Sequence, residues 1–110
     1  MQKIINDLKI TTGSFLEFMV LKMLSGKMSY SIQEIFDILK HAGFNTPKGS
    51  IYPLMTKFRR NNYVKSSYEE GESGFGIRTY YLTEKGRQKL ATLKGDWNRL
   101  NQLIASLGTE

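Results

Sequence analysis

Cysteine is absent from the 110 residues of the chain. Disulfides, thiol nucleophiles and cysteine-ligated zinc are therefore excluded, and a reducing compartment suits the chain. Histidine occurs once, at His41, and its place near the end of a predicted helix favours a capping or dipole role over catalysis. Paired carboxylates, metal-ligand spacing and a phosphate-binding glycine loop are all missing. We therefore expect no enzymatic activity, no metal and no cofactor.

Long apolar runs are missing as well. The most apolar stretch, Phe15 to Leu24, is interrupted by Glu17 and Lys22 and is about half as long as the ~20 residues of a membrane-spanning helix. The N-terminal sequence MQKIINDLKITTG has no small-residue cleavage site, which argues against a secretory signal. With 40% hydrophobic residues the chain can build one modest core. We expect a cytoplasmic protein with a single domain over residues 1–110.

Acidic residues are missing from one segment in particular. The chain as a whole has a net charge of +6, which predicts a phosphate-bearing partner, either nucleic acid or a membrane surface. The segment from Thr46 to Tyr68 contains no acidic residue and five basic ones, namely Lys48, Lys57, Arg59, Arg60 and Lys65. The excess positive charge is therefore concentrated in this one segment.

Apolar spacing predicts two helices before this basic segment. The first covers Phe15 to Leu24, with a cap at Gly13-Ser14 and an end at Ser25-Gly26, and it is apolar on nearly every side. The second has Ser29 and Ser31 as possible caps, with Glu34 in capping-box spacing after Ser31, and it ends at Gly43. Its apolar residues follow helical spacing, at Ile32, Ile35, Phe36 and Leu39.

The basic segment itself predicts a third helix, whose inward side carries Ile51, Leu54, Met55 and Phe58. Thr46 is the expected N-cap, and Pro47 is the expected first helical residue. Pro53 then lies inside the helix and removes a hydrogen bond to the Gly49 carbonyl. Alternatively the regular helix begins at Ser50, in which case Pro53 lies in its first turn at little cost.

The second half of the chain predicts a hairpin and a long helix. The stretches YVKSSYEE and IRTYYLT are rich in β-branched and aromatic residues and flank the glycine-rich GESGFG, which is typical of a β-hairpin. Thr83-Glu84 opens a last helix that continues to about Leu107. The apolar residues of this helix follow a heptad pattern, at Leu90, Leu93, Trp97, Leu100, Ile104 and Leu107.

The predicted order α-α-α-β-β-α is the layout of a winged helix-turn-helix, a mainly α fold with a small β-hairpin. We expect residues 14–82 to form the DNA-binding region and residues 83–107 to form a long C-terminal dimerisation helix. In this layout the third helix carries the acid-free segment, so the positive charge lies where a DNA-binding protein needs it.

Three motifs carry a family resemblance. They are GSIYPLMTKF from Gly49 to Phe58, EEGESG from Glu69 to Gly74, and YYLTEKG from Tyr80 to Gly86. In this order they resemble the PadR family of bacterial transcriptional regulators over nearly the whole chain. The resemblance implies a dimeric winged-helix protein, usually a repressor, whose third helix enters the major groove while its wing touches the DNA backbone. The family's usual prolines and paired basic residues are missing after the wing glycines, so Arg78 is the only wing cation.

The outward side of the third helix gathers small, hydroxyl and basic side chains, which can contact phosphates and base edges. Together with Lys65 and the wing cation they give the candidate DNA-binding residues Lys48, Gly49, Ser50, Tyr52, Thr56, Lys57, Arg60, Lys65 and Arg78. A symmetric dimer would place two such helices on a pseudo-palindromic operator in double-stranded DNA.

The heptad pattern of the last helix would leave an apolar stripe uncovered on so small a monomer, which predicts a homodimer. The predicted interface residues are Phe15, Met19, Leu90, Leu93, Trp97, Leu100, Ile104 and Leu107. In some short PadR-like regulators a tryptophan in a similar place lines a cavity between subunits. By that resemblance Trp97, Phe15, Met19 and Leu100 could bind a planar hydrophobic inducer; the alternative is that Trp97 only anchors the interface.

One function from another class remains open. A winged-helix module can mediate protein interactions without binding DNA, because fold does not fix function. Such a module has no need of an acid-free outer face from Thr46 to Tyr68. A basic membrane-surface protein is less well supported, because neither the first nor the last helix combines a cationic face with an exposed apolar one.

Overall fold

The computed structural model describes residues 12–70 and 76–108. These residues form four helices and three strands. The elements follow one another as α2 (Thr12–Leu24), β1 (Tyr30–Ser31), α3 (Ile32–His41), α4 (Lys48–Arg60), β2 (Val64–Glu70), β3 (Gly76–Leu82) and α5 (Glu84–Ser106). The mainly helical winged helix-turn-helix predicted from the sequence is confirmed.

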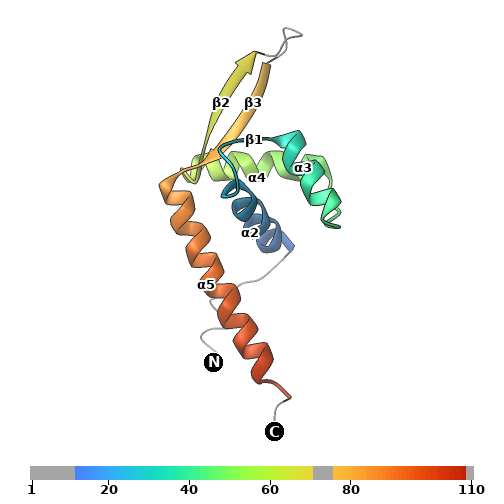
Figure 1. Ribbon diagram of the computed structural model, residues 1–110, viewed down its shortest axis with the longest axis vertical. Helices are drawn as coiled ribbons and strands as arrows, with labels where there is room; N and C mark the ends of the chain where they lie inside the picture. The colour runs from blue at the N-terminus through green and yellow to red at the C-terminus, as the bar shows by residue number, and fades with distance from the viewer. Residues whose placement is uncertain (1–11, 71–75, 109–110) are drawn as a thin grey trace.

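The molecule is elongated, with principal extents of 63 × 28 × 21 Å. The β2–β3 hairpin projects at one end and the C-terminal half of α5 projects at the other (Figure 1). The helices α2, α3 and α4 pack together between these two ends. None of the helices in the described ranges is long and apolar enough to cross a membrane.

The core is built from the apolar sides that the helical spacing predicts. In α4 the buried residues are Ile51, Leu54, Met55 and Phe58. In α3 the buried residues are Ile32, Ile35 and Leu39, whereas Phe36 is only partly buried against the core. Val64 and Leu82, which pair with each other at the base of the hairpin, seal the core against the sheet.

The sheet has one strand more than the sequence predicts. Its order is β1-β3-β2, all antiparallel, with Tyr30 opposite Tyr80 and Ser31 opposite Thr79. Because β1 is two residues long, its sequence carries no alternating pattern that could announce it. This short strand ties the start of α3 to the wing. The predicted hairpin is confirmed, while its glycine-rich tip, residues 71–75, lies outside the described residues.

Two predicted helix starts are wrong by short distances. Helix α2 already contains Gly13 and Ser14, which the sequence analysis placed in its cap. Helix α4 begins at Lys48, and Pro47 is its N-cap with ψ 140° and no side-chain cap bond, so Thr46 does not cap it. The Pro47 carbonyl accepts from the Ser50 N–H at 2.9 Å.

Pro53 lies inside α4, which is continuous from Lys48 to Arg60. Neither predicted start, at Pro47 or at Ser50, is therefore correct. Both Pro53 and Gly49 are exposed, so the Gly49 carbonyl that lacks the Pro53 donor can face water. The outward position of Pro53 explains how the helix tolerates it.

The predicted caps of the other two helices are confirmed. Ser31 and Glu34 form the capping box of α3, and the side chain of Thr83 accepts from the Gly86 N–H at the start of α5. Thr83 also donates its hydroxyl toward the Asn62 and Tyr63 carbonyls, at 2.6 and 3.0 Å. A Cβ atom at Gly86 would lie 2.2 Å from the Tyr63 carbonyl oxygen. The absence of a side chain at Gly86 therefore lets α5 start directly against the turn that precedes the wing.

The other predicted features of α3 are its end and its histidine. Gly43, which follows the helix, has a φ of 90°, a conformation that favours glycine. His41 occupies the last turn, where its Nδ1 lies 2.8 Å from the Asp37 carbonyl oxygen. This local bond agrees with a capping role for His41.

Candidate nucleic-acid interface

The outward side of α4 is exposed and free of acidic residues. Opposite the buried residues lie Gly49, Pro53, Thr56 and Arg60, all exposed. Thr56 donates its hydroxyl to the Tyr52 carbonyl at 3.1 Å, a bond within the helix that leaves the oxygen able to accept. The three basic residues of the last turn are Lys57, Arg59 and Arg60. This side of the helix presents positive charge and hydroxyl groups to solvent.

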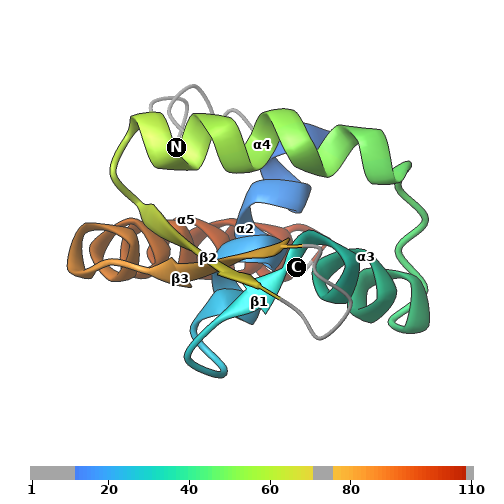
Figure 2. The same ribbon diagram turned by 90° about the horizontal axis from the view of Figure 1, so that it is seen from above.

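A groove of about 460 Å³ lies between α4, the start of α3 and the wing. Helix α4 runs beside the hairpin and spans the width of the molecule (Figure 2). Three of the predicted DNA-binding residues, Lys48, Tyr52 and Arg78, line this groove. Lys48 donates to the side chain of Gln33 on α3, which holds the ammonium group at the groove wall. The fold thus brings α4 and the wing together as the sequence analysis expects.

The pairing of the wing strands separates its side chains onto two faces. Arg78 lies opposite Tyr68, and its Nη1 donates to Ser66 Oγ at 2.9 Å, so these three residues share the face toward the groove. We call this the inner face of the wing. Residues that alternate with them, such as Lys65 and Tyr81, lie on the outer face.

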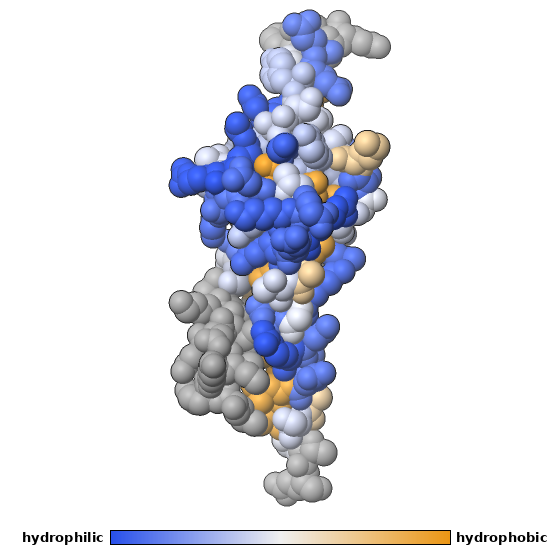
Figure 3. Space-filling model, turned by 90° about the vertical axis from the view of Figure 1, so that its left-hand side faces the viewer, coloured by the Kyte–Doolittle hydropathy of each residue, from blue (hydrophilic) through white to orange (hydrophobic). Residues whose placement is uncertain are grey.

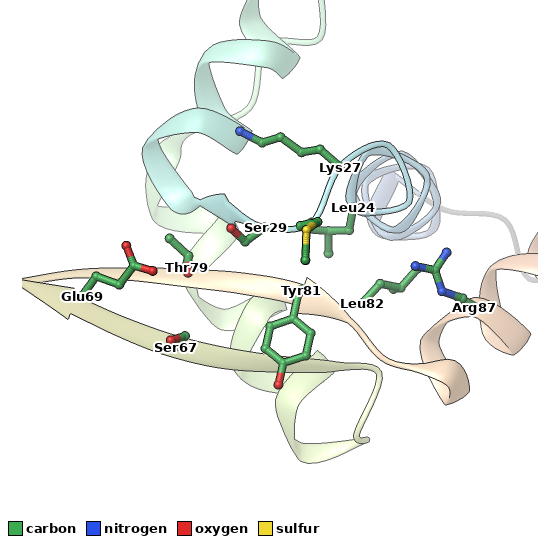
Figure 4. Close-up of a pocket in the computed structure, with 10 residues that line it drawn as sticks. Leu24, Lys27, Ser29, Ser67, Glu69, Thr79, Tyr81, Leu82 and Arg87 are labelled. Carbon is green, nitrogen blue, oxygen red and sulfur yellow. The ribbon is translucent and has the colours of Figure 1, made fainter.

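Lys65 differs from Arg78 in the face of the wing that it occupies. It pairs with Tyr81 and lies on the opposite face of the sheet from Arg78. A second hollow of about 370 Å³ opens on this outer face, between the turn after α2, the wing and Arg87 of α5 (Figure 4). The charge count placed Lys65 with the DNA-binding residues, but the strand alternation directs it away from α4.

Lys57 lies on the flank of α4 that faces α2. Its Nζ is 2.5 Å from Glu17 Oε1, in a salt bridge between the two helices. The remaining predicted α4 residues, Gly49, Ser50, Thr56 and Arg60, are exposed without an inter-helix ion pair among the described residues. Arg60 is thus better placed than Lys57 to meet a phosphate.

The predicted set omits three residues that the structure places at the same surface. Arg59 shares the flank of α4 that carries Tyr52, Gln33 holds Lys48, and Tyr68 lies beside Arg78. The helical wheel could have identified Arg59, because it falls seven residues after Tyr52. Gln33 and Tyr68 come from other elements, and only the tertiary contacts reveal them.

The heptad pattern of α5 divides into a buried and an exposed part. Leu90 is 5% exposed and packs in the chain's own core, which leaves it little surface for a dimer contact. Leu93 also packs partly against that core. Farther along, Ile104 is 57% exposed and Leu107, the C-cap residue, is 65% exposed. Apolar surface gathers along this end of α5 in Figure 3.

Trp97 lies at the boundary between these two parts, against α2 of its own chain. Its ring centroid is 4.7 Å from that of Phe15 and 5.6 Å from that of Phe18, which stacks on it with an interplanar angle of 19°. Met19 is partly buried and packs against the core, while Phe15 stays 42% exposed. Trp97 therefore has an intrachain role, joining α5 to α2, whatever else it contacts.

Comparisons with known proteins agree with this geometry. A family model described as the transcriptional regulator PadR-like family matches residues 20–92. A PadR-like transcription factor from Bacteroides fragilis is 26% identical over 86% of this chain and 90% of that chain, with a TM-score of 0.76. A transcriptional regulator from Streptococcus is 25% identical over 91% of this chain and 100% of that chain, also with a TM-score of 0.76.

The fold is also shared with a protein crystallised on DNA. The structure of Bacillus subtilis PadR in complex with operator DNA is 22% identical, with a TM-score of 0.64 over 71% of this chain and 45% of that chain. No curated protein sequence matches the chain.

Proposed function

The chain belongs to the transcriptional regulator PadR-like family, and from this premise we propose that it is a dimeric, sequence-specific DNA-binding repressor. In this proposal residues 14–82 bind double-stranded DNA, and the C-terminal helix with its cap, residues 83–107, forms the dimer. The protein works in the cytoplasm, where its operator is accessible. A dimer on a pseudo-palindromic operator would block access of other proteins to the DNA it covers.

The observation that carries the proposal is the surface formed by α4 and the inner face of the wing. Arg59 and Arg60 at the end of α4 and Lys48 and Arg78 at the groove supply four cations on the side opposite the projecting half of α5. Phosphate contacts from such residues position a protein on DNA, and hydroxyl groups on the intervening helix can reach base edges. The PadR of Bacillus subtilis, which shares the fold and was crystallised with operator DNA, supports DNA as the partner.

The proposed dimer rests on the exposed part of α5. Leu100, Leu103 and the strongly exposed Ile104 follow helical spacing on one side beyond the last core contact. A second copy of this stripe would cover it in a symmetric interface. Because α5 starts at the base of the wing through Thr83 and Gly86, pairing of two α5 helices would also fix the separation of the two DNA-binding surfaces.

The proposal includes relief of repression by a planar hydrophobic ligand at Trp97, Phe15, Met19 and Leu100. The support is the aromatic group of Trp97, Phe15 and Phe18, against which a flat ring could stack. Binding would quench the emission of Trp97, the only tryptophan of the chain. If Trp97→Ala stays dimeric and its DNA binding still responds to the ligand, this role is refuted.

The test of DNA binding is selection of duplexes from a random pool by the purified protein at low salt, followed by footprinting. We expect enriched sequences with two inverted half-sites separated by about one helical turn, roughly 10 bp. Enrichment of single half-sites would contradict the dimeric arrangement. Failure to retain any duplex at low salt would contradict DNA binding and favour a protein-interaction module.

A further inference from the structure

Among the described residues of the wing, Tyr68 is the most exposed aromatic one. It lies on β2, its side chain is 62% exposed, and it faces Arg78 across the hairpin on the inner face. An aromatic ring with this exposure contributes little to the core. Since the ring lies on the side of the wing that faces the α4 groove, it stands where the proposed DNA would pass.

The position of this ring depends on a glycine in the neighbouring strand. Gly76 is two residues from Arg78 on β3, and a Cβ atom there would lie 1.7 Å from Tyr68 Cζ and 1.8 Å from its hydroxyl oxygen. The ring therefore lies against the backbone of β3 at Gly76, in space that the side chain of every other residue type would fill. Any side chain at Gly76 would push Tyr68 out of this position.

Arg78 lies beside the ring, on the same face of the wing. Its guanidinium carbon lies 6.0 Å from the ring centroid of Tyr68, and its Nη1 bonds to Ser66 Oγ at 2.9 Å. The ring and the cation are thus arranged before any partner binds. A preorganised aromatic side chain loses little conformational entropy on binding, which makes it an efficient contact residue.

We propose that Tyr68 is a further DNA-contacting residue, whose ring packs on the sugar-phosphate backbone next to the phosphate that Arg78 meets, and that Gly76 is the positioning residue that leaves room for the ring against β3. This inference rests on the proposed DNA-binding function. Because a ring releases no counterion, its contribution to affinity is independent of salt, whereas the contribution of Arg78 falls as salt rises.

The experiment measures binding of a fluorescent duplex, selected from a random pool by the wild-type protein, over a range of salt concentrations. We expect Tyr68→Ala to weaken binding about tenfold with an unchanged salt slope, as is typical for the loss of an aromatic contact. Arg78→Ala should weaken binding and also reduce the slope by about one unit. Tyr68→Phe, which keeps the ring, should lose less affinity than Tyr68→Ala.

Gly76→Ala provides the sharper test, because its effect should pass through the ring. We expect it to weaken binding in the wild-type background and to have no effect in the Tyr68→Ala background. Tyr81→Ala is the matched control, because Tyr81 is 38% exposed on the outer face of the same hairpin. Its affinity should equal that of the wild type. Circular dichroism and sedimentation of each variant verify that fold and assembly are unchanged.

If Tyr68→Ala binds the duplex with wild-type affinity, the inference is overturned. It is also overturned if Gly76→Ala lowers the affinity by the same factor in the Tyr68→Ala background as in the wild type. Either result leaves the proposed function intact, because the wild-type protein still binds the duplex. If the wild-type protein binds no duplex at low salt, the proposed function fails and this inference fails with it.

Discussion

Helices α4 and α5 leave opposite kinds of surface exposed. Helix α4 buries its apolar residues Ile51, Leu54, Met55 and Phe58 and presents an acid-free exterior. Helix α5 is longer, at 23 residues, but buries only Gly86 and Leu90, and its apolar side chains become more exposed toward Ile104. In α4 the apolar surface is covered, and apart from Lys57, which pairs with Glu17, its cations have no ion pair among the described residues. In α5 the apolar residues near the C-terminal end stay exposed within the described part of the chain.

This difference indicates two kinds of partner at the two ends of one molecule. A basic surface with an acid-free exterior gains most from a polyanion, through release of counterions. An apolar stripe gains most from removal of water by a complementary apolar stripe. We therefore propose that DNA binds the α4 and wing end and that a second chain binds the α5 end.

The largest expected effect comes from a substitution on the buried side of α4. Phe58 is 2% exposed, so Phe58→Ala should lower the free energy of unfolding by about 3–5 kcal/mol through lost burial and a residual cavity. Tyr52→Ala, on the exposed side of the same helix, should change it by less than about 0.5 kcal/mol. Urea unfolding at fixed protein concentration measures both. Equal losses of stability in the two variants would contradict the assignment of Phe58 to the buried side of α4 and Tyr52 to its exposed side.

The next largest effect is expected from a substitution on the exposed apolar side of α5. Ile104→Asp places a charge in the proposed interface and should raise the dimer dissociation constant by at least about tenfold, because burying an unpaired carboxylate is costly. Gln102→Asp, an equal change of charge on the opposite side of α5, should leave dissociation unchanged. Sedimentation velocity over a concentration series measures both variants. Unaltered dimerisation of Ile104→Asp would place the interface elsewhere.

A smaller effect concerns α3, which supports α4. Ser31→Ala removes the acceptor of the Glu34 N–H bond and should lower the free energy of unfolding by about 1 kcal/mol. Ser67→Ala, an exposed serine on the outer face of the wing, is the control and should have no effect beyond about 0.5 kcal/mol. Thermal unfolding followed by circular dichroism compares the two. If Ser31→Ala loses no more stability than Ser67→Ala, the Ser31 cap does not stabilise α3.

The smallest effect is a dependence of stability on pH. The hydrogen bond from Lys27 lowers the pKa of Glu34, and the Ser31 backbone N–H lowers it further. A carboxyl whose pKa is depressed in the folded state stabilises the protein above its unfolded pKa and loses this contribution as pH falls through its folded pKa. The stability difference between wild type and Glu34→Gln should therefore shrink in acid. If the stability difference between the wild type and Glu34→Gln stays constant from neutral to acidic pH, the assigned bonds of Glu34 are contradicted.

Local patterns in the sequence were sufficient for the elements and much of the core. Helical spacing identified the buried side of α4, and capping chemistry identified Ser31 and Thr83 as helix starts. Pro47 shows the limit of such signals, because proline is favoured at the first helical position, whereas here it is the N-cap. The predicted start at Pro47 therefore lies one position before the observed start at Lys48.

The candidate site depended on contacts that no local pattern encodes. Lys65 entered the predicted set through its charge, but the pairing of Val64 with Leu82 fixes which face of the wing it occupies. Leu90 fits the heptad pattern, yet the core of its own chain already covers it. Tyr68 gains its place from Gly76 in the other strand, which is a tertiary contact.

The central claim is that the acid-free end of α4 binds the DNA backbone. The most direct measurement is the salt dependence of duplex affinity for the wild type, Arg60→Ala and Lys94→Ala, the last of which removes an exposed cation from α5. We predict a steep loss of wild-type affinity with salt, a slope reduced by about one unit in Arg60→Ala, and no change in Lys94→Ala. A wild-type affinity that does not depend on salt, or an equal reduction of the slope in both variants, would contradict the claim.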